Sequence, residues 1–226
     1  MTTRARLIET CVPRAPQGVA LVLHGGASRR DSMMVSPTQL SVLRMVPIAG
    51  RLAHAGRGGL AVFRLLNSTR GWDTRHTPVD DVHWALDLLR ERFGEDLPTC
   101  LVGHSLGGRA ALLSADQPAV RSAVLLAPWV YDTDGDRLDL SGRRILVVHG
   151  DQDRIASIRR AEVVASALRR TTDVGFVRVA GGKHSMLRHQ HVFDKLAADF
   201  AAATLLGERP RGAVARVLEG QPLVEV

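Results

Sequence analysis

The chain has 226 residues, of which 45% are hydrophobic and 23% charged, as expected for a globular protein with a full core. Its formal net charge is +7, yet the arginines are spread along the chain and no basic run is interleaved with aromatic residues, so nucleic-acid binding is not predicted. No apolar run is long enough to span a membrane, and the amino terminus lacks the apolar stretch of a secretory signal. We therefore expect a soluble, cytoplasmic protein with no membrane partner.

Strand and helix patterns alternate from the amino terminus onward. Strands are predicted at 6–12, 19–23, 60–66, 99–102, 120–127, 145–148 and 174–179. The first is a short edge strand, and most of the others are unbroken apolar runs. Helices are predicted at 39–55, 78–93, 106–115, 158–169 and 189–206. Pro47 must kink the first of these helices or begin a new one. Polar loops are expected at 27–38 and 67–73.

This alternation predicts an α/β protein with a mostly parallel, doubly wound sheet and helices on both faces. Residues 1–206 are expected to form a single domain. Residues 207–226, which begin with a Pro/Arg/Gly hinge at 210–212, are expected to form a C-terminal tail. This tail would pack on the surface of the domain or on a second subunit.

A Gly-x-Ser-x-Gly pattern, Gly103-His104-Ser105-Leu106-Gly107, stands between a predicted strand and a predicted helix. A serine on such a tight turn has a strained backbone, and a side chain two residues before or after it would collide with the neighbouring strand or helix. The pattern therefore predicts a nucleophile elbow with an exposed serine hydroxyl. An ordinary turn serine is the alternative interpretation.

Further chemically useful side chains follow other strands, at the edge where ligands bind in open parallel sheets. Asp151 and Asp153 follow the strand at 145–148, and His184 follows the strand at 174–179. Together with Ser105 they give the order Ser, Asp, His. Asp132, which follows the preceding strand, is a competing acid.

On these residues the chain resembles the α/β-hydrolase fold superfamily, and most of all its small, lidless members such as dienelactone-hydrolase-like proteins and simple carboxylesterases. The resemblance covers 19–206 and lies in four segments: Leu23-His24-Gly25-Gly26, Gly103-His104-Ser105-Leu106-Gly107-Gly108, His149-Gly150-Asp151-Gln152-Asp153 and Gly182-Lys183-His184. Dienelactone hydrolases proper have a cysteine where Ser105 stands, and the amino-terminal strand hairpin usual in the superfamily is shortened here. Many relatives insert a lid where this chain has only the polar segment 129–142, so no lid domain is expected.

The resemblance implies a Ser105–His184–Asp153 triad, and the chemistry agrees with it. A serine hydroxyl needs a base to remove its proton, and the histidine needs a carboxylate to hold its tautomer, with Asp153 preferred over Asp151 and Asp132. The backbone N–H groups of Gly26 and Leu106 are expected to form the oxyanion hole. His24 is expected to shape the loop of that hole through hydrogen bonds.

Trp72 and Trp129 fall at strand ends, where they either wall a substrate pocket or pack at the rim of the core. The acidic run at 132–136 has its glycine misplaced for a calcium loop, and no zinc, phosphate or dinucleotide motif occurs, so no metal and no cofactor is expected. The predicted function is hydrolysis of a small ester or thioester through an acyl-enzyme. Acyl transfer or perhydrolysis on the same triad, and a non-catalytic ligand-binding protein of the same fold, are the alternatives.

Overall fold

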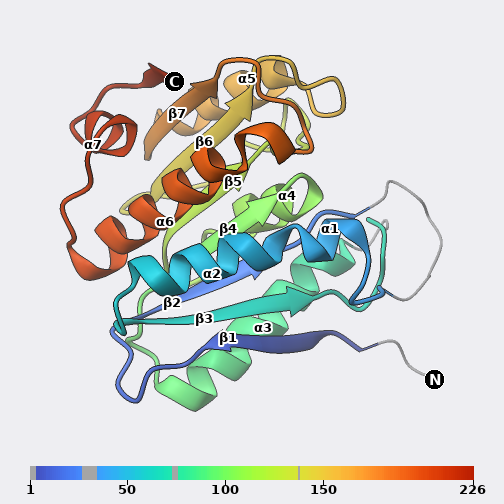
Figure 1. The fold of residues 1–226 in the computed structure, drawn as a ribbon, viewed down its shortest axis with the longest axis vertical. Helices are drawn as coiled ribbons and strands as arrows, with labels where there is room; N and C mark the ends of the chain where they lie inside the picture. The colour runs from blue at the N-terminus through green and yellow to red at the C-terminus, as the bar shows by residue number, and fades with distance from the viewer. Residues whose placement is uncertain (1–3, 27–34, 73–75, 137) are drawn as a thin grey trace.

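The computed structural model describes residues 4–26, 35–72, 76–136 and 138–226, so most of the expected loop at 27–38 and Asp73 of the second loop lie outside it. Its centre is an eight-stranded sheet in the order β1-β3-β2-β4-β5-β6-β7-β8 (Figure 1). The strands are β1 (Arg6–Cys11), β2 (Gly18–Leu23), β3 (Leu60–Leu66), β4 (Thr99–His104), β5 (Val120–Leu126), β6 (Arg144–Gly150), β7 (Asp173–Val179) and β8 (Leu223–Glu225). The helices are α1 (Leu40–Leu43), α2 (Met45–Ala55), α3 (Thr77–Phe93), α4 (Leu106–Leu113), α5 (Ile158–Leu168), α6 (Gln190–Leu206) and α7 (Ala213–Leu218), with a short 3₁₀ turn at Leu187–His189.

All neighbouring strands are parallel except β1, which runs antiparallel to β3 at one edge of the sheet. Every residue of β2 and β4 is buried, because helices cover both faces of these central strands. This is the environment that unbroken apolar runs predict. The carboxyl ends of β4, β6 and β7 consequently lie at the same edge, and they carry the predicted site residues.

Helices α2, α6 and α7 pack on one face of the sheet, and α3, α4 and α5 pack on the other. In Figure 1, α2 and α6 cross the near face side by side, while α3 lies behind the strands. Each face buries its own apolar cluster, so the sheet separates two cores. The doubly wound α/β arrangement predicted from the sequence is confirmed. Among the described helices, none has the length and apolar character needed to cross a membrane.

The helix predicted at 39–55 is interrupted at Arg44, which separates α1 from α2. Pro47 lies in the first turn of α2, where a missing backbone N–H removes no hydrogen bond within the helix. Of the two outcomes predicted for Pro47, a new helix is therefore the one that occurs.

Residues 207–226 fold against the same sheet rather than extending away from it. Strand β8 pairs in parallel with β7, and Val214 and Val217 of α7 are buried in the core on the α6 face. The tail thus packs on this chain's own surface, which was one of the two predicted arrangements. A domain boundary at 206 stays a prediction.

Gly175 of β7 makes the close approach of α7 possible, because a Cβ atom at this position would lie 1.8 Å from Cγ1 of Val217. We expect Gly175→Ala to lower the free energy of unfolding by about 1–3 kcal/mol, since the added methyl group overpacks this contact. In a Val217→Ala background, Gly175→Ala should lower the free energy of unfolding much less, because the Cγ1 atom of Val217 is absent. Urea denaturation of the two single variants and the double variant measures this difference.

Gly50→Ala in α2 is the matched control, because nothing lies within 4 Å of a Cβ built there. It should raise stability by up to about 1 kcal/mol through helix propensity. Equal costs of Gly175→Ala with and without Val217 would show that α7 does not dock as described.

Candidate active site

Ser105 occupies a strained turn between β4 and α4. Its φ of 56° and ψ of −119° lie where a non-glycine residue is rarely found. Hydrogen bonds hold the turn on both sides: the Ser105 N–H donates to the carbonyl of Leu126, and the Ser105 carbonyl accepts from the N–H groups of Arg109 and Trp129. The hydroxyl is thus fixed at the carboxyl edge of the sheet, as the sequence pattern predicts.

The glycines of the pattern stand where backbone meets backbone. A Cβ on Gly103 would lie 2.1 Å from the carbonyl oxygen of Gly107. A Cβ on Gly107 would lie 2.5 Å from the carbonyl oxygens of Leu23 and His24. Backbone cannot move aside as a flexible side chain can, so both positions require glycine.

The structure brings Ser105, His184 and Asp153 into one hydrogen-bonded chain. The Oγ of Ser105 lies 3.0 Å from Nε2 of His184, and Nδ1 of His184 lies 2.8 Å from Oδ2 of Asp153. With Nδ1–H donating to the carboxylate, Nε2 of neutral His184 is free to accept the serine proton. The arrangement can therefore generate a nucleophilic serine.

The two competing acids have other contacts. Oδ1 of Asp151 accepts the N–H of Gly181 at 2.7 Å and so closes a turn. Asp132 lies half-exposed, 3.8 Å from Arg160. In the described part of the chain, Asp153 is the only carboxylate in contact with His184.

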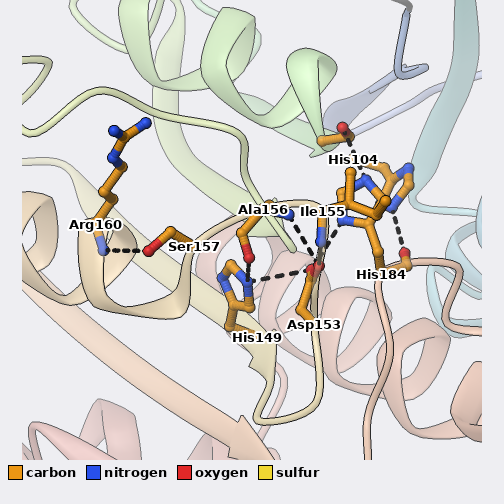
Figure 2. A network of polar contacts seen from close by, with 9 residues as sticks. His104, His149, Asp153, Ile155, Ala156, Ser157, Arg160 and His184 are labelled. Atoms are coloured by element: carbon orange, nitrogen blue, oxygen red, sulfur yellow. Dashed lines mark hydrogen bonds and ion pairs between the residues drawn. The ribbon is translucent and has the colours of Figure 1, made fainter.

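Asp153 lies between two imidazole rings, His149 on one side and His184 on the other (Figure 2). Its side chain is fully buried, and Oδ1 accepts the N–H groups of Ile155 and Ala156 at 2.8 and 2.9 Å. Nε2 of buried His149 is 3.3 Å from Oδ2. Burial disfavours the carboxylate, but the hydrogen bonds from His149, His184 and Ala156 outweigh it and hold the pKa of Asp153 well below its usual range.

A third histidine, His104, supports the His184 backbone. Its Nε2–H donates to the carbonyl oxygen of His184 at 2.9 Å, and the two rings lie with their centroids 4.9 Å apart. Burial, followed by the neighbouring His184, lowers the pKa of His104 to about 3. His104 is therefore a neutral donor that positions the loop carrying His184. The sequence shows that His104 directly precedes Ser105, but it does not show that His104 contacts the carbonyl of His184.

A pocket of about 290 Å³ opens above Ser105, and we call it the Ser105 pocket. It is lined by Gly25, Gly26, Leu40, Ser41, Arg44, His104, Ser105, Leu106, Trp129, Ile155 and His184. Gly26 and Leu106, the two predicted oxyanion-hole residues, thus flank Ser105. Within the described residues, neither of their backbone N–H groups donates a hydrogen bond to a backbone carbonyl outside the helices and strands.

His24 shapes the loop that carries Gly25 and Gly26. The N–H of Asn67 donates to Nε2 of His24 at 3.2 Å, which leaves Nδ1–H to donate to the carbonyl of Gly25 at 2.6 Å. Burial lowers the pKa of His24, so the ring is a neutral structural group. This agrees with the role predicted for it.

The structure separates the two predicted tryptophans. Trp129 lines the Ser105 pocket, whereas Trp72 does not and packs against the core on the α3 face. The Trp72 ring faces the guanidinium of Arg109 at 4.6 Å, and Tyr131 faces the same guanidinium at 4.6 Å. Trp72 is therefore a packing residue in this structure, which was the alternative weighed for it.

Arg109 of α4 is held by a buried ion pair that the sequence analysis did not identify. Its Nε and a terminal nitrogen contact the two carboxylate oxygens of Asp134 at 2.7 and 2.8 Å, and both side chains are buried. Oδ2 of Asp134 also accepts the N–H of Tyr131. The pair ties the helix after Ser105 to the segment that carries Trp129.

No family model and no curated protein matches this chain at a significant level. Solved structures do match. Est1E from Butyrivibrio proteoclasticus is 16% identical with a TM-score of 0.64, covering 89% of this chain and 94% of that one. An alpha-beta serine hydrolase homologue from Coxiella burnetii is 17% identical with a TM-score of 0.64, covering 86% and 89% of the two chains. XC6422 from Xanthomonas campestris, described as an a/b serine hydrolase without lid, is 19% identical with a TM-score of 0.60, covering 85% of each chain. At these identities the likeness is one of fold, and it extends over most of this chain.

Replacing Arg109 by methionine should be among the most damaging single changes in the chain. The substitution leaves the buried carboxylate of Asp134 unpaired, which typically costs about 3–5 kcal/mol of stability. Arg90→Met is the matched control, because the Arg90–Asp87 pair is exposed and its loss should cost less than about 1 kcal/mol. Chemical denaturation compares the two variants, and similar costs would contradict the role given to Arg109.

The buried His104 should make the protein less stable in mild acid. The unfolded chain binds a proton on this ring below about pH 6.5, whereas the folded chain resists it down to about pH 3, so stability falls as the pH drops through this window. Between pH 7.5 and 5 the wild type should lose about 2 kcal/mol more than His104→Gln, whose amide can still donate to His184. Denaturation curves across this range measure the loss, and parallel pH profiles for the two proteins would contradict the prediction.

Proposed function

We propose that this chain, which has the α/β-hydrolase fold, is a serine hydrolase that cleaves small esters or thioesters through an acyl-enzyme. The observation that carries the proposal is the chain of contacts from Ser105 through His184 to the buried Asp153, at 3.0 and 2.8 Å. The serine hydrolases among the structural neighbours support the same class of reaction.

In the first half of the reaction, Ser105 Oγ attacks the carbonyl carbon while Nε2 of His184 takes the hydroxyl proton. The carbonyl oxygen becomes an oxyanion, which the N–H groups of Gly26 and Leu106 stabilise. His184 then gives its proton to the departing alcohol or thiol. The ester bond is broken, and the acyl group is left on Ser105.

In the second half, water takes the place of the alcohol. His184 removes a proton from the water, the hydroxide attacks the acyl carbon, and the serine oxygen leaves with the proton that His184 returns. Asp153 stays ionised throughout, since the hydrogen bonds from His149, His184 and Ala156 hold its pKa well below its usual range. Its charge stabilises the imidazolium that forms twice in each cycle.

The size of the Ser105 pocket supports a small substrate. Its volume of about 290 Å³ is at the lower end for ligand pockets, and the described part of the segment between β5 and β6 contains no helix that could cover it. Ile155 and Leu40 stand exposed at its rim. Such a site suits a short acyl group better than a long lipid chain.

A fluorophosphonate probe and short 4-nitrophenyl and thiophenyl esters test the proposal. The wild type should be labelled at Ser105, as identified by peptide mass spectrometry, and should release the free acid. Ser105→Ala should lose the label, and Asp153→Asn should lower kcat by about four orders of magnitude, because His184 then loses its orienting acceptor. Asp132→Asn, at the competing acid that does not contact His184, should stay within about threefold of the wild type.

Circular dichroism must show each variant folded for these comparisons to count. A folded wild type that takes no label and turns over no ester would contradict the proposal and favour a non-catalytic binding protein. Acylated product in place of free acid, when alcohols or peroxide are added, would instead identify acyl transfer or perhydrolysis.

A further inference from the structure

Arg44 stands between the Ser105 pocket and a second pocket. Together with Leu40 it lines both of them. The second pocket has a volume of about 240 Å³, and Leu43, Met186 and Leu187 supply apolar parts of its wall. Arg44 belongs to the junction between α1 and α2.

The guanidinium of Arg44 has no anionic partner within the described residues. Its Nε atom is buried without any hydrogen-bond acceptor. Asp194 is the only described carboxylate that lines the second pocket, and the basic residues that act on it are Arg51 and His191. Asp153 is already enclosed by its own donors. Burial lowers the pKa of Arg44, which reports the cost of keeping its charge partly away from water.

The charges of the residues that line the Ser105 pocket favour an anion. Arg44 is the only permanently charged side chain among the described residues of that lining. The described lining contains no carboxylate that would repel an anionic substrate. Arg44 lines this pocket together with His104, Ser105 and His184.

We propose that the site prefers esters that carry a carboxylate, and that Arg44 binds this carboxylate while Ser105 attacks the ester carbonyl. The inference rests on the proposed function and narrows its substrate class. An unpaired, half-buried guanidinium gains two charge-assisted hydrogen bonds from a carboxylate, which a neutral ester cannot supply. Arg44 is thus a specificity-determining residue.

Two matched pairs of esters test this on the two sides of the scissile bond. On the acyl side, the 4-nitrophenyl monoester of adipic acid is compared with 4-nitrophenyl hexanoate. On the alcohol side, 4-acetoxybenzoate is compared with its methyl ester. In at least one pair, Arg44→Gln should lower kcat/KM for the anionic member by about tenfold or more and leave the neutral member within about twofold, since a hydrogen bond between charged groups is worth that much.

Arg57→Gln is the matched control. Arg57 follows the opposite end of α2 and lines a different, polar depression, so its loss removes the same charge without touching the Ser105 pocket. Its kcat/KM values should match those of the wild type for all four esters. Equal losses in Arg44→Gln for both members of each pair, or no loss in either, would overturn the proposal.

A binding measurement separates this proposal from the proposed function. If the wild type takes no fluorophosphonate label, the hydrolase assignment fails, and calorimetric titration with benzoate and benzamide still tests Arg44. Benzoate binding that is lost in Arg44→Gln and kept in Arg57→Gln would support anion recognition. Benzoate binding that is unchanged in Arg44→Gln, or absent from the wild type, would overturn it.

Discussion

The close approach of backbone to backbone around Ser105 is the constraint on which the rest of the site depends. Gly103 and Gly107 let β4, α4 and the end of β2 meet at distances that no side chain would permit. The positive φ of Ser105 is tolerated because hydrogen bonds to neighbouring segments hold the turn on both sides. The backbone that carries the Ser105 hydroxyl is therefore already fixed before a substrate binds. Little conformational entropy is lost in positioning it for attack.

Around this turn, the hydrogen-bond partners of Asp153 and His184 decide which way protons can move. Donors surround Asp153, so the carboxylate stays charged, and its acceptance of Nδ1–H leaves Nε2 of His184 facing Ser105. His104 donates a hydrogen bond to the backbone carbonyl of His184 and does not contact the reacting atoms. The buried pair between Arg109 and Asp134 ties α4 to the segment that carries Trp129. The site is thus supported by separate contacts from several strands.

Much of this arrangement could be predicted from the sequence, because parallel strands bring their carboxyl ends to one edge and strand patterns are readable as apolar runs. That logic placed Ser105, Asp153 and His184 close together without any contact being known. It could not find the pair between Arg109 and Asp134, since two charged residues on a helix and in a loop carry no local sign of burial. For the same reason Trp72 and Trp129 looked equivalent, although only Trp129 reaches the pocket. Nothing in the sequence distinguishes Arg44 from the many other arginines, because its lack of an anionic partner is seen only in the structure.

The strand order also bears on how the chain reaches its structure. Strand β2 pairs with β3 and with β4, and β3 is in turn covered by β1, so the earliest strands are completed only by segments much later in the chain. Each pairing closes a long loop before it gains any contact, and such non-local topologies fold slowly. While β4 is still unpaired, the edge of β2 that it will occupy stays open to other chains. The same strand, β4, leads directly into Ser105, so the step that pairs this edge of β2 also brings the nucleophile to the carboxyl end of the sheet.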